Sequence, residues 1–393
     1  MLPRLLCVGD VPVEASYHGS ALLYRLLSDY PAGRLIIVET ARQSEPSRRL
    51  PNVPYFSYPI AKSRWLNTRF HPYAVAWYTE VAAQTGPRIG QMVTEFGFDF
   101  DFDSVLTVAH GFGWQAAAAM ARKRKAPLHL IVHDDWPRAA GIASSWRKWL
   151  DNSFARVYRQ AQSRMCVSPS MSRFYEERYG APAEVMYPSR AIDCPDYDEP
   201  PAHLARNDKP FTIAFAGTIN SNGYLQALLA LQQSLKAING RLLIFGPLTT
   251  GEAQHAGLRD AVMRGLLSSS ELLTRLREEA DALFVPMSFD PGDRANMEMA
   301  FPSKLADYTA TGLPLLIYGP AYCSAVTWAH ENPGASEVVK SEPALSPAIQ
   351  RIANDVHHRV TLGKRALEVG RRYFSHSRAK KLFYQSLSVQ ASV

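Results

Sequence analysis

The most informative residues of this 393-residue chain are 301–317, which read Phe301-Pro302-Ser303-Lys304-Leu305-Ala306-Asp307-Tyr308-Thr309-Ala310-Thr311-Gly312-Leu313-Pro314-Leu315-Leu316-Ile317. The pair Pro302-Ser303 is typical of a helix start, so this stretch predicts a helix over about 303–311. Gly312-Leu313-Pro314 ends that helix, and the apolar run that follows predicts a buried strand. A helix that turns straight into a buried strand is the repeating unit of a parallel α/β sheet.

The same residues carry groups that suit a phosphate ligand. A helix start offers free N–H groups and partial positive charge, and such an end binds phosphate. Lys304 adds a full positive charge beside it. One turn later, the Asp307 carboxylate can accept hydrogen bonds from ribose hydroxyls. An ordinary helix start with no ligand is the alternative that these residues leave open.

Alternation of strand and helix patterns extends over the whole chain. The candidate strands are Leu5–Gly9, Leu35–Glu39, Val105–Ala109, Leu128–Val132, Met165–Val167, Ala183–Met186, Phe211–Ala216, Arg241–Phe245, Ala282–Val285 and Leu315–Ile317. The candidate helices lie at about 19–29, 114–124, 223–238, 269–279, 303–311 and 364–389. This order predicts parallel sheets covered by helices on both faces.

A break in the pattern divides the chain in two. Residues 187–210 carry five prolines with acidic residues among them, and neither a strand nor a helix pattern continues there. We therefore predict Rossmann-like domains over 1–190 and 211–365, a linker over 191–210, and a final helix within 366–393. Two such domains in sequence are expected to face each other across a cleft at the carboxyl ends of their strands.

Composition excludes several classes of protein. The sequence contains no apolar run of the roughly 18 residues that a membrane-spanning helix needs. The apolar start, Met1–Gly9, is too short for a signal peptide. The four cysteines have no paired spacing, which favours reduced thiols in the cytoplasm over a metal cluster; they are Cys7, Cys166, Cys194 and Cys323.

Positive charge is concentrated in the first half. Residues 1–195 hold 23 Lys and Arg against 17 Asp and Glu, whereas residues 196–393 hold 20 against 19. Such an excess favours an anionic partner, namely a lipid surface, a phosphorylated acceptor or nucleic acid. A surface that only maintains solubility explains the excess equally well.

Residues 301–317 resemble the nucleotide-sugar signature of GT-B glycosyltransferases, especially the family 4 group, in which P-S-K-L-x-E-Y-x-A-x-G-x-P is common. The resemblance implies two Rossmann-like domains facing a cleft, with a C-terminal helix that crosses back to the first domain. It assigns the acceptor to the first domain and the nucleotide-sugar to the second. It also implies that Lys304, next to Pro302, Ser303 and Leu305, meets the diphosphate, and that Asp307 binds the ribose where the group usually has Glu.

Other donor contacts follow from the same resemblance. Gly217 and Thr218 match the Gly turn that opens the family's second domain, and Asn220 continues it with a neutral amide where relatives often have a basic residue. The family's sugar-binding Glu falls on Met299, so the adjacent Glu298 is the expected substitute. Gly19 occupies the place of the Gly-rich turn of the first domain.

On the acceptor or sugar side, the sequence proposes residues that follow two strands of the first half. His133 follows the strand Leu128–Val132, where several relatives carry a His near the reacting sugar, with Asp134 and Asp135 directly after it. His110 follows the strand Val105–Ala109. A histidine satisfied within the core, or a simple turn, is the alternative for both.

The activity expected from the resemblance is transfer of a sugar from a nucleotide-sugar to an acceptor hydroxyl, with retention of configuration. Neither a metal nor a cofactor is expected, because the carboxylates of Asp99-Phe100-Asp101 precede a strand instead of following one. A sugar-nucleotide epimerase, a non-catalytic relative and a nucleic-acid glucosylating enzyme are the alternatives, although nucleic acid is the less favoured partner.

An aromatic and basic stripe over residues 146–159 offers a peripheral membrane contact. Trp146, Trp149, Phe154 and Tyr158 recur at helical spacing, with Arg and Lys between them. Such a stripe is more often packed as core.

Overall fold

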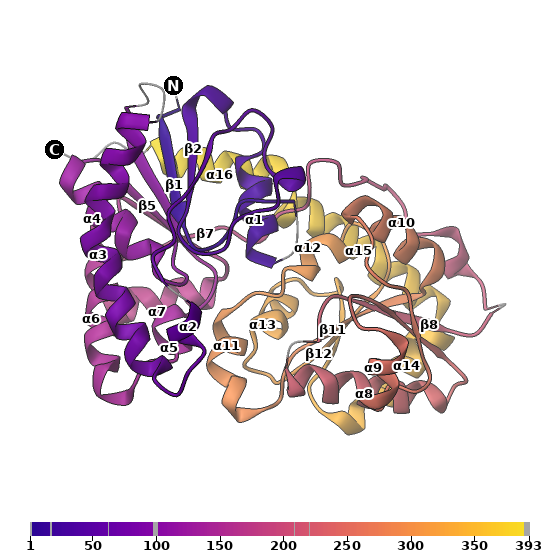
Figure 1. Cartoon of the computed structure of the whole chain (residues 1–393). Helices are drawn as coiled ribbons and strands as arrows, with labels where there is room; N and C mark the ends of the chain where they lie inside the picture. Colours follow the sequence, from indigo (N-terminus) through magenta and orange to yellow (C-terminus); the bar gives the residue numbers. More distant parts are fainter. Residues whose placement is uncertain are drawn as a thin grey trace. The chain divides into compact units, whose positions relative to one another are not determined.

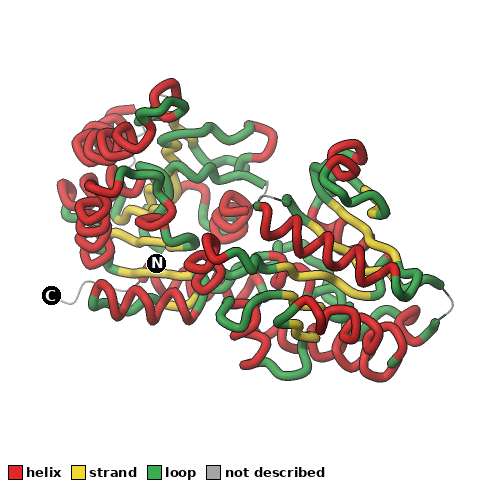
Figure 2. The backbone as a smooth tube through the Cα atoms, turned by 90° about the horizontal axis from the view of Figure 1, so that it is seen from below, coloured by secondary structure: helices red, strands yellow, loops and turns green. Residues whose placement is uncertain are grey.

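The computed structural model describes residues 2–15, 18–61, 63–96, 101–207, 209–219 and 221–388. The chain forms two compact units (Figure 1). The first unit comprises Met1–Tyr187 with Ser377–Val393, and the second comprises Pro188–His376. In each unit the strands lie among helices, as Figure 2 shows in yellow and red. The prediction of two parallel α/β domains is therefore confirmed.

The first unit is built on a seven-stranded parallel sheet with the order β3-β2-β1-β4-β5-β6-β7. Its strands are β1 (Leu5–Gly9), β2 (Leu35–Glu39), β3 (Tyr55–Ser57), β4 (Ser104–Val108), β5 (Leu128–Val132), β6 (Ser163–Cys166) and β7 (Glu184–Val185). The three-residue β3 has no counterpart among the strands predicted from sequence, because so short a run carries no clear alternation.

Helices cover both faces of this sheet. They are α1 (His18–Leu27), α2 (Ser63–Leu66), α3 (His71–Phe96), α4 (Gly113–Arg124), α5 (Trp136–Ala139), α6 (Ser144–Gln160), α7 (Pro169–Tyr179) and α16 (His376–Ser388), with short 3₁₀ turns at Ala32–Arg34 and Pro46–Arg48. Leu5 and Cys7 of β1 pack in one core with α1 and α16. Since side chains alternate along a strand, Leu6 and Val8 face the opposite layer.

The apolar stripe of α6 belongs to the interior. Four side chains of α6 are buried, namely Leu150, Phe154, Val157 and Tyr158. The ring of Phe154 packs edge-to-face against Trp114 of α4, with ring centroids 5.5 Å apart. The alternative that this stripe is core is therefore the one that the structure supports. Trp146, at the start of the helix, stays 44% exposed.

The second unit is built on a six-stranded parallel sheet with the order β10-β9-β8-β11-β12-β13. Its strands are β8 (Thr212–Ala216), β9 (Arg241–Phe245), β10 (Ala261–Met263), β11 (Ala282–Pro286), β12 (Leu315–Tyr318) and β13 (Glu337–Val339). The four predicted strands form its centre, and the two short strands that the sequence did not reveal form its edges.

The helices of the second unit are α8 (Asn222–Lys236), α9 (Thr250–His255), α10 (Ser269–Glu279), α11 (Arg294–Met299), α12 (Lys304–Tyr308), α13 (Ser324–Glu331), α14 (Leu345–Asn354) and α15 (Val356–Phe374), with 3₁₀ turns at Ala202–Ala205, Pro291–Asp293 and Glu342–Ala344. Side chains of α8 and α14 share a buried cluster with Ile213 and Phe215 of β8.

The proline-rich segment predicted as a linker over 191–210 lies inside the second unit. Leu204 is fully buried, and the buried guanidinium of Arg359 in α15 donates hydrogen bonds to the carbonyl oxygens of Leu204 and Arg206 at 2.8 to 2.9 Å. This buried arginine fastens the segment to the helix. The sequence alone does not indicate this contact, because the partners of Arg359 are backbone carbonyls about 150 residues away in the chain.

The C-terminal segment forms two helices instead of one. α15 ends at Phe374 in the second unit, and α16 begins at His376 and packs into the core of the first unit through Phe383 and Leu387. Lys380 Nζ lies 2.9 Å from Asp29 Oδ2, and Tyr384 donates to the carbonyl of Asp29. The expected crossing of a C-terminal helix back to the first domain is thus observed.

The described helices include none long and apolar enough to cross a membrane. All four cysteines are free thiols, and three of them are buried.

The docking of α16 yields a test by stability. Phe383→Ala removes a fully buried ring and should lower the free energy of unfolding of the first unit by about 3–5 kcal/mol. Lys381→Ala, on the exposed side of the same helix, should change it by less than about 0.5 kcal/mol. Urea denaturation of both variants measures the difference. Equal stability of the two would show that α16 does not belong to the core.

Candidate functional site

The second unit has its topological switch point between β8 and β11. From β8 the chain continues to β9 on one side, whereas β11 pairs with β8 on the other. Ligands of open parallel sheets bind outside the carboxyl ends of the strands at such a point. In this unit the residues at that position are Gly217, directly after β8, and Ser288, shortly after β11.

The backbone at Gly217 lies close to Lys304, the lysine predicted to bind phosphate. The Gly217 φ of +138° is a conformation that side-chain-bearing residues rarely adopt, and the Gly217 amide donates to the carbonyl of Phe245 at 2.8 Å. A Cβ added at Gly217 would lie 3.7 Å from Lys304 Nζ. Thr218 follows, half-buried, and Asn220 lies outside the described residues.

The ammonium of Lys304 is held against aromatic rings. Its Nζ lies 4.2 Å from the centroid of the Phe215 ring and 5.4 Å from that of Tyr224. Loss of hydration lowers the pKa of Lys304 from its ordinary 10.5 to about 7. A cation desolvated in this way gains strongly from an anionic ligand, because the anion restores the favourable interactions that water gave it.

A tyrosine on the same short helix fixes the lysine to the sheet. Tyr308 is buried, and its hydroxyl lies 2.6 Å from the Ala216 amide, at the end of β8, and 3.3 Å from the Ala216 carbonyl oxygen. Lys304 and Tyr308 are four residues apart and so occupy one face of α12. The lysine therefore stays beside Gly217 without relying on loop conformation.

The start of α8 adds a second positive element. Ser221 caps this 15-residue helix by accepting from the Tyr224 amide, and residues 217–227 contain no Asp or Glu. Gly223 packs against Ser288, where any side chain would collide with the Ser288 hydroxyl. The N-terminal amides of a long helix suit an anion.

The start of α12 differs from the expectation. Instead of about 303–311, the helix spans Lys304–Tyr308, and its first amides, those of Leu305 and Ala306, already donate to the carbonyls of Pro302 and Ser303. A five-residue helix contributes little dipole, since the dipole is a sum over aligned peptides. Of the residues predicted here, Ser303 is exposed, Pro302 is half-buried, and Leu305 is fully buried as packing.

Asp307 lies half-buried on α12, one turn after Lys304. A buried arginine that sequence reasoning missed supports this turn. Arg190 donates from Nε to the Ala306 carbonyl and from Nη2 to Thr309 Oγ1, both at 3.2 Å. The Asp307 carboxylate raises the pKa of Arg190, against the stronger lowering by burial. Arg190 lies in the proline-rich break, where no periodicity indicates a buried position.

The expected sugar-binding carboxylate occupies a partly exposed place. Glu298 Oε1 accepts from Arg294 Nε at 3.0 Å, one turn earlier on α11. Met299, where the family has its Glu, is 3% exposed and points into the interior. Glu298 can leave a surface ion pair at small cost, because such pairs contribute little to stability.

In the first unit, Gly19 and His133 lie together. Gly19 is in the first turn of α1, and a Cβ added there would lie 2.8 Å from His133 Cε1. Burial lowers the pKa of His133, as does His110, while Asp134 raises it. The histidine is therefore neutral near pH 7, and its Nδ1 is buried with no hydrogen-bond partner.

Three predicted side chains converge here. His133 Nε2 lies 3.5 Å from Asp134 Oδ2, and the rings of His110 and His133 are 6.0 Å apart between centroids. Ligand atoms of all three residues lie within 4.8 Å of one another, as metal ligands do. Asp135 differs, because its buried carboxylate accepts from the Tyr175 hydroxyl at 2.9 Å and pairs with Arg138. Asp135 thus has a structural role in this unit.

The switch point of the first unit is filled by the protein itself. Asp10, directly after β1, accepts hydrogen bonds from the amides of Phe112 and Gly113 at the start of α4 and from the Thr40 hydroxyl. The helix start that could hold a phosphate already holds a carboxylate. The corresponding place in the second unit has Gly217 where the first unit has Asp10, with Lys304 Nζ beside it, so the second unit is the one suited to a diphosphate.

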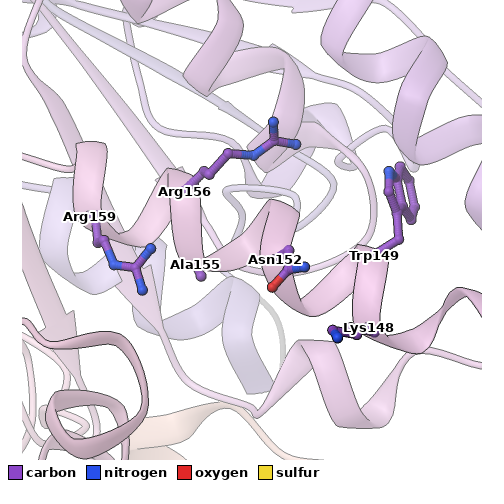
Figure 3. Close-up of a pocket in the computed structure, with 6 residues that line it drawn as sticks. All are labelled: Lys148, Trp149, Asn152, Ala155, Arg156 and Arg159. Atoms are coloured by element: carbon purple, nitrogen blue, oxygen red, sulfur yellow. The ribbon is translucent and has the colours of Figure 1, made fainter.

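A shallow surface pocket of about 590 Å³ lies on α6 and is basic (Figure 3). It is lined by Lys148, Trp149, Asn152, Ala155, Arg156 and Arg159. Both of its arginines also make hydrogen bonds within the protein. Arg156 donates to Ser153 Oγ, and Arg159 donates to the Tyr179 carbonyl. None of the candidate residues above lines this pocket.

Comparison with known proteins agrees with the resemblance seen in the sequence. Residues 34–194 match the profile of Glycosyltransferase Family 4. No curated protein sequence matches the chain. Among solved structures, HepE of Anabaena, in complex with UDP and glucose, is 13% identical with a TM-score of 0.68, over 99% of this chain and 100% of its own.

Two further structures give the same fold. Sucrose-phosphate synthase from Thermosynechococcus elongatus is 15% identical with a TM-score of 0.67, over 97% of both chains. WaaG, a glycosyltransferase involved in lipopolysaccharide biosynthesis, is 13% identical with a TM-score of 0.62, over 98% of this chain and 100% of its own. The chain therefore has the GT-B fold of glycosyltransferases.

The lysine yields a test that needs no substrate. Carbon-13 NMR of the reductively methylated protein should show one lysine, absent in Lys304→Arg, that titrates near pH 7 while the others titrate near 10.5. Because the folded pKa lies below the ordinary one, the unfolded chain binds the extra proton between these values. The contribution of Lys304 to the free energy of unfolding thus rises with pH from about 7 to 10.5.

Addition of inorganic diphosphate should move that resonance to a higher pKa, because the anion stabilises the charged amine. A Lys304 resonance that titrates with the surface lysines, and does not respond to diphosphate, would contradict the site.

Proposed function

We propose that this protein is a glycosyltransferase that moves a sugar from a nucleotide-sugar donor to an acceptor hydroxyl. The observation that carries the proposal is the desolvated ammonium of Lys304 at the switch point of the second sheet. Its Nζ would lie 3.7 Å from a Cβ built onto Gly217, and it is near the start of α8. The family match over 34–194 and the fold shared with a glycosyltransferase solved with UDP and glucose support it.

The chemistry requires that negative charge building on the leaving diphosphate be stabilised. Preorganised positive groups in a site poor in water do this best, since they need not reorient during the reaction. Lys304 supplies a full charge, and the amides at the start of α8 supply a partial one. Donor binding raises the pKa of Lys304, so that the amine is charged when the glycosidic bond breaks.

The remaining contacts position the two substrates. Asp307 accepts hydrogen bonds from the ribose, while Glu298 is placed to exchange its ion pair with Arg294 for hydroxyls of the donor sugar. His133, neutral near pH 7, can donate from one ring nitrogen and accept at the other, which suits it to orient a sugar or acceptor hydroxyl. His110 and Asp134 surround it.

We further propose a metal-independent and retaining reaction. Lys304 and the start of α8 provide the positive charge that a divalent ion provides elsewhere. Retention rests on the resemblance to the family alone. Activity that persists in the presence of a chelator is the expected result.

The acceptor that we propose is anionic or lipid-linked, and the work of the enzyme is synthesis of a glycan at the inner face of a membrane. The excess of positive charge in residues 1–195 supports this.

Loss of the lysine gives a direct assay. Lys304→Ala should lower the rate at which a nucleotide-sugar releases its nucleoside diphosphate by at least ~10²-fold, because one preorganised charge is removed from the transition state. Lys236→Ala, at an exposed ion pair with Asp260, is the matched control and should keep full turnover. Near wild-type turnover in Lys304→Ala would disprove the assignment of the diphosphate site.

Asp307→Asn should behave differently. It should raise the donor KM more than it lowers kcat, because the ribose is remote from the bond that breaks and its contact stabilises ground and transition states alike. Steady-state kinetics with varied donor separates the two constants. A variant that kept the donor KM and lost kcat would give Asp307 a role in the chemical step instead.

A further inference from the structure

Four large aromatic side chains of the first unit are turned toward solvent within thirteen residues. Trp65 is 48% exposed, Phe70 49%, Tyr73 60% and Trp77 67%. We refer to these four residues as the aromatic patch. Most large apolar side chains of the chain are buried, and exposed aromatics gathered in one place indicate an interaction surface.

The patch is held by local structure. The Thr68 hydroxyl donates to the carbonyl of Trp65 and accepts from the amide of Phe70, which closes the turn between α2 and α3. Tyr73 and Trp77, four residues apart on α3, lie on the same face of the helix.

The exposure of the aromatic patch does not mean that α3 lacks a buried face. Other residues of α3 provide its buried face, namely Val75, Ala76, Tyr78, Ala82, Ile89 and Val93. The helix thus has a complete interior side and a separate aromatic side. An aromatic face kept on an already packed helix needs a partner outside this unit's core.

The charges around the patch are mainly positive. Residues 60–80 contain Lys62, Arg64 and Arg69 and one carboxylate, the exposed Glu80 on α3. The Arg64 guanidinium lies 5.6 Å from the Trp65 ring centroid, and that of Arg69 lies 5.0 Å from the Phe70 ring centroid. Cations are therefore set directly beside the rings.

The patch adjoins the start of α6. A Cβ added at Gly141, in the loop before that helix, would lie 2.7 Å from His71 Nε2 at the start of α3. Trp146, 44% exposed, follows within five residues and packs edge-on against Trp149.

We infer that the aromatic patch binds an anionic lipid bilayer, with its rings at the level of the headgroups and Arg64 and Arg69 against lipid phosphates. Trp and Tyr favour the membrane–water interface because their rings are apolar and their N–H or O–H groups are polar. Basic residues beside them are attracted to an anionic surface. The two kinds of residue are what a surface-bound segment requires.

Charge also argues against a second copy of the chain as the occupant. A symmetric dimer places the same surface on both sides, so Arg64 and Arg69 would meet the same cations. Residues 60–80 offer one carboxylate, Glu80, against three basic residues, so two copies would still face each other with a net positive charge. Like charges placed opposite one another in an interface are unfavourable.

This inference rests on the proposed function, because membrane binding would bring the enzyme to the lipid-linked acceptor proposed above. Its test does not use the nucleotide-sugar donor. The full-length chain is sedimented with vesicles of phosphatidylglycerol and phosphatidylcholine, and with vesicles of phosphatidylcholine alone, at low and high salt. Binding to the anionic vesicles that weakens as salt rises is the expected result.

Two variants separate the rings from the charges. Tyr73→Ser/Trp77→Ser should lower binding at least ~10-fold at both salt concentrations, because apolar insertion is not screened. Arg64→Gln/Arg69→Gln should lower binding at low salt and flatten its salt dependence. The matched control is Leu266→Ser/Phe289→Ser, which removes two exposed apolar side chains of the second unit and should leave binding unchanged.

Quenching of tryptophan emission by brominated lipids gives a second readout, and Trp77→Phe should reduce it. Three results would overturn the inference. They are absence of vesicle binding at low salt, loss of binding in Arg147→Gln/Lys148→Gln on α6 but not in the patch variants, and a dimer in light scattering that Tyr73→Ser/Trp77→Ser converts to monomer. If vesicle binding fails while Lys304→Ala still loses turnover, the inference is wrong and the proposed function stands.

Discussion

Desolvation of one ammonium group, that of Lys304, is the constraint around which the second unit is arranged. The amine has the face of Phe215 at 4.2 Å, and its pKa falls to about 7. A free lysine at the surface would swing into water and avoid that cost. Lys304 stays at the sheet because Tyr308 binds α12 to the end of β8. Arg190 also holds the helix in place by donating to the Ala306 carbonyl and to Thr309 Oγ1. An anionic ligand removes that cost, which favours binding of a diphosphate beside Lys304.

The two units show how one topology serves two purposes. Both sheets are parallel, and in both the order of successive strands reverses beside the first strand. In the first unit Asp10 occupies the switch point and satisfies the amides at the start of α4. In the second unit the residue directly after the first strand is Gly217, and Lys304 Nζ lies beside it. The first switch point thus holds a carboxylate and the second an amine, which suits the second to a phosphate.

Sequence reasoning succeeded where a signal is local. Buried strands such as β1 and β8 were placed correctly because apolar runs bounded by glycine are short-range patterns. The diphosphate-binding role of Lys304 came from a helix-start pattern and the family resemblance, and it stays a prediction. Sequence reasoning failed where a partner is distant in the chain. Arg190 and Arg359 became visible only when their carbonyl partners were in place, and the predicted linker then proved to be part of the second unit. The length of α12 was overestimated, because the helix ends at Tyr308 and residues 309–312 form turns. The aromatic patch was missed because exposure, unlike periodicity, is a property of the folded chain.

The measurement that tests the central claim most directly is thermal unfolding in the presence of UDP-, GDP-, ADP- and TDP-sugars and their nucleoside diphosphates. A ligand that binds only the folded chain raises Tm, and the shift grows with the logarithm of the ligand concentration above Kd. The account predicts that at least one nucleotide series raises Tm, for the sugar form and the diphosphate alike, and that Lys304→Ala abolishes the shift. No shift with any member of the panel, or a shift that survives in Lys304→Ala, would contradict it.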